Sequence, residues 1–219
     1  MKKITIQSAN VTAPTLNGQS EENTNNLLRL TEGEELSRKM YLKGKLESLS
    51  APYLSFNNCT FNQIQFNECK FRDAQFCDIR FENCDLSNIS FINSMFYRVE
   101  FVSCKLTGTN FPDTTMSHVL MQQCHSHYLN LSGSKLKNVL FADNDMQHAS
   151  LEHCAFSSVA FQNCNLLEAE FVQTALKGID LRTCQIPGLR VNIPDLKGAV
   201  ITTPQGLDLL PLLGTIISD

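Results

Sequence analysis

The sequence predicts an all-β solenoid whose coils have four short sides, and three observations on residue spacing predict it. Large apolar residues recur at every fifth position from Phe56 to Ile201, and all 14 phenylalanines fall in this one phase. Gly, Asn or Asp is frequent two positions after these centres, as at Asn83, Gly108 and Asp143. Cysteine or another small residue is frequent two positions before them. A repeat of five residues therefore organises most of the chain.

This period fits a backbone that turns a corner in every repeat. An α-helix repeats every ~3.6 residues and a strand every ~2 residues, so neither places each fifth side chain on one face. Gly, Asn and Asp tolerate the left-handed conformation that a tight corner needs. Four corners close a coil of about 20 residues, and successive coils stack at the strand spacing of about 4.8 Å.

The nine cysteines are explained by the same phase. Eight of them lie two positions before a centre, in a slot that elsewhere holds Ile, Val, Ala, Ser or Thr. The exception is Cys77. Free cysteine packs as a small hydrophobe, whereas a metal site needs clustered Cys and His ligands at close spacing. We therefore expect reduced thiols in the core, no metal site and no cofactor.

Three segments are predicted. Residues 1–50 form an irregular N-terminal segment and cap, although a weak phase passes through Leu36, Tyr41 and Leu46. Residues 51–203 form the β-helix. Residues 204–219 form a C-terminal helix or tail, with Thr203 as its N-cap and Pro204 as its first residue. The apolar residues of this tail predict capping, dimerisation or both; they are Leu207, Leu210, Leu213, Ile216 and Ile217.

Composition excludes several classes of function. The N-terminus has no long apolar run, which predicts a cytoplasmic protein without a membrane partner. The net charge is −4, which argues against a basic nucleic-acid-binding surface. No phosphate-binding loop, nucleophile–base pair or metal motif stands out, so an enzyme is the weakest hypothesis.

Grouping the repeats by fours divides the surface into four faces of different charge. Face A is centred on Phe61 and Phe81, and face B on Phe66 and Leu86; the formal charges of these neighbouring faces sum to −5. Face C follows, and face D, centred on Phe76, carries +3. The candidate partner-facing acids of faces A and B are Glu68, Glu82, Asp85, Glu100, Asp143, Asp145, Glu168 and Asp180. Uneven scatter of surface charge would give a similar count.

Two local features add hypotheses. Leu120 and Leu140 occupy a normally polar slot of face A and predict an apolar partner contact. The apolar series breaks once, at Ser126, which lies among His125, His127 and Tyr128 and one coil before Asp145 and His148. This group could be a metal site or a catalytic His–Asp pair, but a distorted corner with surface hydrogen bonds is the favoured interpretation.

Several segments resemble the pentapeptide-repeat family, whose repeat is A(D/N)LxX. The clearest are CDLSN (84–88), CKLTG (104–108), TNFPD (109–113) and CNLLE (164–168). The resemblance implies a right-handed quadrilateral β-helix. The segments CKLTGTNF (104–111), LKGIDL (176–181) and TPQGLDLLPLLGTIIS (203–218) resemble the Qnr-type quinolone-resistance proteins of Gram-positive bacteria.

The narrower resemblance implies a function. Qnr-type proteins are dimers joined at their C-terminal ends, and they bind DNA gyrase and topoisomerase IV and protect them from fluoroquinolones. Many extrude two loops, whereas this chain keeps its phase without an obvious insertion. We expect a non-enzymatic, dimeric topoisomerase-binding protein that mimics DNA. The alternatives are a scaffold rod with an unrelated partner and an immunity protein against a natural gyrase poison.

Overall fold

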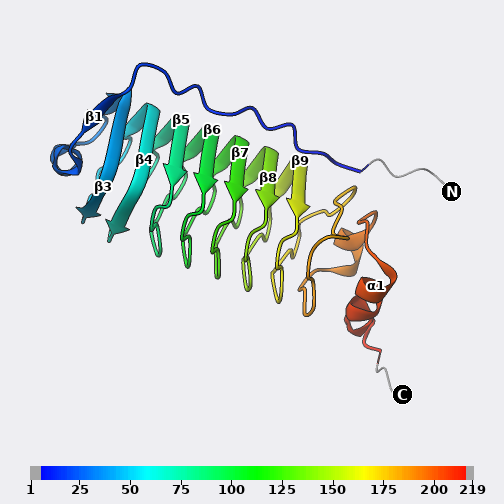
Figure 1. Ribbon diagram of the computed structural model, residues 1–219. Helices are drawn as coiled ribbons and strands as arrows, with labels where there is room; N and C mark the ends of the chain where they lie inside the picture. The colour runs from blue at the N-terminus through cyan, green and yellow to red at the C-terminus, as the bar shows by residue number, and fades with distance from the viewer. Residues whose placement is uncertain (1–5, 216–219) are drawn as a thin grey trace.

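The computed structural model describes residues 6–215, which form a parallel β-solenoid with one short helix at its C-terminal end (Figure 1). Within these residues one sheet contains nine strands, in the order β1-β3-β4-β5-β6-β7-β8-β9, and β2 pairs with β4. The strands are β1 (Ser20–Glu22), β2 (Glu35–Ser37), β3 (Lys39–Glu47), β4 (Ser55–Asn67), β5 (Gln75–Glu82), β6 (Met95–Val102), β7 (Thr115–Gln122), β8 (Lys135–Ala142) and β9 (Ala155–Gln162). All described pairs are parallel.

The pairing register confirms coils of 20 residues. Phe56 lies opposite Phe76, and Phe76 lies opposite Phe96. Each strand from β5 to β9 covers two sides of the coil because a residue in its middle turns the corner; in β5 this is Asp78, with a φ of 55°. Faces D and A are therefore strand-rich, while faces B and C are joined by single bridges such as Asp85 to Lys105.

The core consists of columns in which each centre stacks on the centre 20 residues later. The rings of Phe76 and Phe96 lie 4.9 Å apart between centroids with an interplanar angle of 6°. Phe91 and Phe111 repeat this geometry at 4.8 Å and 6°, and neighbouring columns meet edge to face. Both arrangements suit the quadrupole of an aromatic ring.

The prediction of reduced thiols two positions before the centres is also confirmed. All nine cysteines are free thiols, eight are buried, and Cys77 alone is half-buried. A typical buried thiol donates to carbonyls of its own coil and the preceding one, as Cys104 does to Val102 at 3.4 Å and to Phe81 at 3.4 Å. The slot thus holds side chains that are small and can satisfy a backbone acceptor.

The solenoid begins earlier than the sequence analysis placed it. Leu36 lies opposite Phe56 and Tyr41 opposite Phe61, so β2 and β3 belong to the same ladder. The structure thus places residues 35–47 in the coil rather than in an irregular cap. Tyr41 is fully buried like the centres that follow it, so the weak apolar phase before residue 51 does mark core positions. The first coil is covered instead by a 3-10 helix, η1 (Thr24–Arg29), whose Leu27 is fully buried.

Residues 6–19 contain no strand and run along the outside of the coils from the C-terminal half of the rod to its N-terminal end (Figure 1). Gln7 donates its N–H to the carbonyl of Gly178, and Asn17 donates to the side chain of Asn58. We call this segment the strap.

The C-terminal end is closed by the helix α1 (Thr203–Leu209), preceded by η2 (Ile193–Leu196) and followed by η3 (Leu210–Leu213). The N-cap is Thr202, one residue before the predicted one, and it forms a capping box with Gln205. Gln205 is buried and donates to the carbonyls of Leu181 and Cys184 at 2.7 and 2.8 Å. The helix therefore covers backbone acceptors that a further coil would otherwise use. No helix in residues 6–215 is long and apolar enough to cross a membrane.

The prediction of a distorted corner at Ser126 is wrong. Its N–H donates to the Asp145 carbonyl at 2.7 Å, and the ladder continues from His125 to Asp145 without a shift. Ser126 occupies the core column and is 1% exposed, and its hydroxyl has no hydrogen-bond partner among the described residues.

A matched pair of serine substitutions tests this difference. Ser126→Ala removes a buried hydroxyl without a partner, so we expect the free energy of unfolding to rise by about 1 kcal/mol. Ser134 is equally buried, but its hydroxyl donates to the Phe111 carbonyl at 2.8 Å and accepts from the Thr114 N–H at 3.0 Å. Ser134→Ala should lower the free energy of unfolding by about 1–3 kcal/mol because the Thr114 N–H loses its acceptor. Urea denaturation measures both, and a loss of stability in Ser126→Ala would contradict the assignment.

Candidate functional site

The structure distributes the eight predicted acids along two neighbouring faces and does not gather them into one cluster. Asp85 and Asp145 share one row of face B, but Lys105 and His125 lie between them. The same row begins at Lys45, opposite Gln65. Because coils stack in register, residues 20 positions apart form a row along the rod. The charged residues of this row, Lys45, Asp85, Lys105 and Asp145, alternate in sign. The summed charge of a face therefore does not show how its charges alternate along a row.

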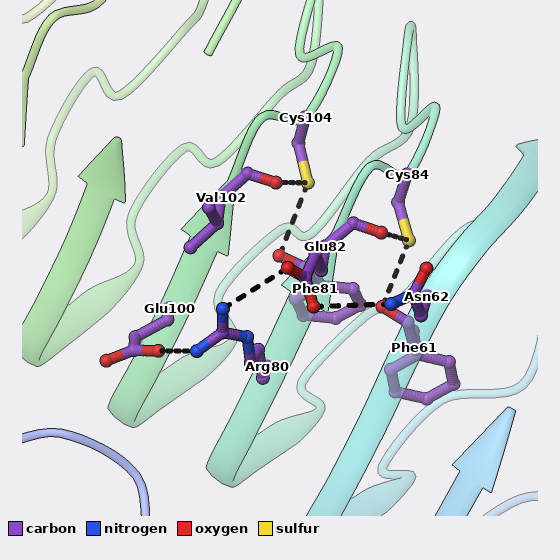
Figure 2. Close-up of polar contacts among 9 residues, drawn as sticks. All are labelled: Phe61, Asn62, Arg80, Phe81, Glu82, Cys84, Glu100, Val102 and Cys104. Carbon is purple, nitrogen blue, oxygen red and sulfur yellow. Dashed lines mark hydrogen bonds and ion pairs between the residues drawn. The ribbon is translucent and has the colours of Figure 1, made fainter. Parts of the chain in front are cut away.

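Figure 2 shows how two acids of face A share one cation in its N-terminal half. The guanidinium of Arg80 lies between two carboxylates: it contacts Glu82 of its own strand at 3.3 Å and Glu100 of the next coil at 3.1 Å. Asn62 of the preceding coil donates to the other oxygen of Glu82 at 3.2 Å. The Glu100 side chain is only 13% exposed. These acids belong to a hydrogen-bonded surface network before any partner arrives.

Four further predicted acids contact a basic side chain, two of them a Lys or Arg and two of them a His. Asp85 contacts Lys105 at 3.4 Å, Asp145 contacts His127 at 2.6 Å, Glu168 contacts His148 at 3.4 Å and Asp180 contacts Arg182 at 2.7 Å. Burial raises the pKa of Asp145, but hydrogen bonds from His127 and Gln147 outweigh it, so this pKa lies below its usual value. The hydrogen bond from Arg182 likewise lowers the pKa of Asp180. Both carboxylates stay ionised at neutral pH.

Glu68 and Asp143 differ from the other six. Within residues 6–215 neither has an ion-pair partner; Glu68 accepts a hydrogen bond from Ser48 at 3.3 Å, and Asp143 accepts one from Asn163 at 3.0 Å. Both occupy left-handed corners, with φ of 52° and 55°. They are the acids of faces A and B whose charge is not offset nearby.

A hollow of about 590 Å³ beside Glu68 was missed by sequence reasoning. It is lined by Glu47, Ser48, Phe66, Asn67, Glu68, Ser87 and Asn88. Glu47 belongs to β3 and faces the same side as Asn67 of the next coil. The sequence analysis begins the β-helix at residue 51 and so assigns no face to Glu47; the position of Leu46 in the phase is the signal that can find Glu47. Glu47 extends the acidic surface of face B toward the N-terminal end.

Leu120 and Leu140, the predicted apolar contact, are neighbours on adjacent strands. Leu120 of β7 lies opposite Leu140 of β8, between Glu100 and Ala160 in the same row. Both side chains are half-buried rather than fully exposed. The pair gives face A an apolar strip next to its paired acids.

The histidines near Ser126 form two separate surface contacts. His127 is hydrogen-bonded to Asp145 at 2.6 Å, with Gln147 within 3.4 Å of the same ring nitrogen. Tyr128, which is 60% exposed, stacks on His148 at 4.9 Å between ring centroids. No group of three or more His, Cys, Asp or Glu side chains in residues 6–215 is arranged to hold a metal ion. The surface hydrogen bonds expected here are present.

Face D differs in character from faces A and B. Asp78 at its edge binds the Arg98 guanidinium through two contacts, at 2.6 and 2.5 Å. Burial raises the pKa of Asp78, but the bonds from Arg98 and from the Thr15 N–H outweigh it, so the pKa lies below its usual value. Lys135, Lys137 and Lys177 remain exposed on this face. The rod thus keeps one basic side.

The C-terminal tail presents apolar side chains to solvent beyond the cap. Leu209 is 9% exposed and closes the core, whereas Leu207 and Leu213 are 57% and 58% exposed. Leu210 is half-buried. The predicted contacts Ile216 and Ile217 lie outside the described residues. Capping thus uses only part of the apolar tail.

Comparison with known proteins identifies the repeat. The family model for the pentapeptide repeat region matches residues 74–151 and 94–171, and the model for the SV2A/B/C luminal domain matches residues 33–111. No curated protein matches the sequence significantly.

The fold is shared with a solved structure. A trypsin-treated variant of QnrB1, a plasmid-mediated fluoroquinolone resistance protein, is 21% identical, with 88% of this chain and 93% of that chain covered and a TM-score of 0.51. HetL, a pentapeptide repeat protein of Nostoc sp. strain PCC 7120 involved in heterocyst differentiation regulation, is 14% identical; 81% of this chain and 93% of that chain are covered, with a TM-score of 0.48. Residues 74–171 therefore match a pentapeptide repeat region, and the chain shares the β-helix fold of QnrB1.

Proposed function

We propose that this protein binds type II topoisomerases, DNA gyrase and topoisomerase IV, and protects them from fluoroquinolones without catalysing a reaction. The observation that carries the proposal is the shared fold with QnrB1, a fluoroquinolone resistance protein. The ending of the chain, which resembles Qnr-type proteins, supports it. A scaffold rod for an unrelated partner is the alternative, and immunity to a natural gyrase poison is a variant of the first function.

The surface that contacts the topoisomerase comprises faces A and B in this proposal. A DNA-binding surface is basic, and a rod with net negative charge on two neighbouring sides can occupy it in place of DNA. The paired acids supply little free charge, because an exposed ion pair is locally neutral. Glu68 and Asp143 have no ion-pair partner among the described residues, and the half-exposed Glu168 contacts only a histidine, so these three acids are expected to matter most.

The second part of the proposal is a homodimer joined through the C-terminal ends. The exposed Leu207 and Leu213 support it because they lie beyond the residues that close the core. In a symmetric dimer, both copies use the same surface, so each buries its own Leu207 and Leu213 in the contact.

Gyrase supercoiling in the presence of ciprofloxacin tests the function. We expect the purified protein to restore supercoiling, and removal of three charges by Glu68→Gln, Asp143→Asn and Glu168→Gln together to raise the protein concentration needed by about tenfold. These changes keep the shape of each side chain.

The matched control carries Asp73→Asn, Asp113→Asn and Glu152→Gln, which remove the same charge from face C. Equal losses in both triple variants would contradict the assignment of faces A and B. Neither rescue nor inhibition by the unmodified protein at micromolar concentration would exclude the topoisomerase function and leave the scaffold.

Leu120→Arg tests the apolar strip of face A. The change places a charge against Leu140, and we expect gyrase binding in a pull-down to fall by at least about tenfold, the cost of one well-packed contact residue. Thermal unfolding checks that the variant is folded. A folded variant with unchanged binding would remove Leu120 and Leu140 from the contact surface.

Leu207→Arg combined with Leu213→Arg tests the dimer. Charged side chains cannot be buried in an apolar contact without a large cost, so we expect analytical ultracentrifugation to show a monomer. Leu28→Arg is the control, because Leu28 is 47% exposed at the opposite end of the rod. A double variant that stays dimeric would place the interface elsewhere.

A further inference from the structure

The strap, residues 6–19, lies against one edge of the rod, the corner between faces D and A. The corner residues of this edge are Asn58, Asp78, Arg98, His118, Asn138, Ser158 and Gly178, and all have a positive φ. We call this row the strap edge. Figure 1 shows the strap crossing the tops of the strands β5 to β9. Each strand turns its corner directly beneath it.

The strap is extended and runs opposite to the direction in which the coils are added. Gln7 contacts the coil of Gly178 and Asn17 contacts that of Asn58, which lies six coils nearer the N-terminal end. At ~4.8 Å per coil this distance is about 29 Å, or about 2.9 Å for each strap residue. This rise is close to that of a polyproline II segment, about 3.1 Å. The strap thus spans the strap edge with almost no slack.

The strap edge binds the strap mainly through the backbone of the strap. Four strap N–H groups donate to the rod: Gln7 to the Gly178 carbonyl at 2.7 Å, Thr12 to His118 Nδ1 at 3.1 Å, Thr15 to Asp78 Oδ1 at 2.8 Å and Asn17 to Asn58 Oδ1 at 3.2 Å. The Asn58 amide also donates to the Asn17 carbonyl at 2.8 Å. Contacts of this kind recognise an extended peptide without reading its side chains.

Side-chain contacts are concentrated at the two ends of the strap. The Gln7 amide donates to the Lys177 carbonyl at 2.8 Å and accepts from the Val159 N–H at 3.3 Å. The Gln19 amide donates to the Asn58 carbonyl at 3.1 Å. Between them the strap is uncharged, and alternate small side chains such as Ala9 and Val11 are half-buried while their neighbours are exposed.

The corner side chains of the other rows have different hydrogen-bond partners. In two of them the corner side chains bond to one another along the row, Asn93 to Asp73 and Asn163 to Asp143. On the strap edge the Asp78 carboxylate is held by Arg98 and still accepts the Thr15 N–H. Among the corner rows of residues 6–215, this row is the one whose polar side chains bind the backbone of a segment outside the coils.

We propose that the strap edge is a binding surface for an extended, uncharged polypeptide, and that the strap occupies it as a displaceable internal ligand. Only four N–H groups and one carbonyl of the strap backbone bond to the rod, whereas the strands beneath the strap pair along their length. Segments with sparse contacts open at a lower free energy than the core. A partner segment of the same extended shape, with small apolar side chains at alternate positions, fits the vacated edge.

The test uses the full-length protein and a fluorescein-labelled synthetic peptide with the sequence of residues 6–19. Thr12→Pro with Thr15→Pro removes two of the strap N–H donors and leaves the strap edge intact. We expect this variant to bind the peptide about tenfold more tightly than the unmodified protein, because its own strap competes less. Fluorescence anisotropy measures the affinity.

Two controls decide the outcome. Asn10→Pro with Ala13→Pro places prolines where the N–H groups make no hydrogen bond, so its affinity should match that of the unmodified protein. Adding Asn58→Gly to the Thr12 and Thr15 variant should reverse the gain, while Asn83→Gly, at an equivalent corner of another row, should not. Equal affinity in both proline pairs, no measurable peptide binding, or a gain that survives Asn58→Gly would overturn the proposal.

Discussion

The 20-residue register between neighbouring coils is the constraint on which every other feature of this protein depends. Because each residue lies beside the residue 20 positions later, a side chain meets its own repeat position and not an arbitrary neighbour. Phenylalanine rings can therefore stack in columns, and thiols and hydroxyls can reach the carbonyls of the preceding coil. An inserted residue would move every later centre out of its column. Left-handed corners keep the register, which explains why Asn, Asp and Gly recur there.

The same register determines what the surface can present to a partner. Charges on one row meet across coils, so Arg80 binds Glu100 and Lys105 approaches Asp85. These pairs lower the local acidity of faces A and B even though the faces sum to a negative charge. The acids without a cationic neighbour, Glu68 and Asp143, lie at corners, where side chains point away from the flat ladder of the strands. A charge-based contact with a topoisomerase would depend on them more than on the paired acids.

A solenoid must also close its two ends and protect its edges. Leu27 covers the first coil, and Gln205 satisfies carbonyls of the last one. The strap adds a lengthwise tie, because its contacts run from Gly178 to Asn58 and so connect coils that have no other contact. Repeat rods otherwise gain stability only between nearest neighbours. The strap edge and the acidic faces lie side by side, since the strap follows the boundary of face A.

The sequence by itself determined the period, the four-sided coil, the core columns and the packing role of the cysteines, because each depends on local spacing that repeats many times. It also placed the acids correctly on faces A and B. Tertiary structure alone decided that Arg80, Lys105 and Arg182 pair with particular acids and that His127 contacts Asp145, since the contacts of a side chain are not visible in a formal charge sum. It decided that the 20-residue register begins at residue 35, where the apolar phase is weak, and that Ser126 is buried without a shift of the ladder. The strap could not be foreseen at all, because residues 6–19 follow no repeat and are held by corner side chains and backbone carbonyls, including the Lys177 carbonyl 170 positions away.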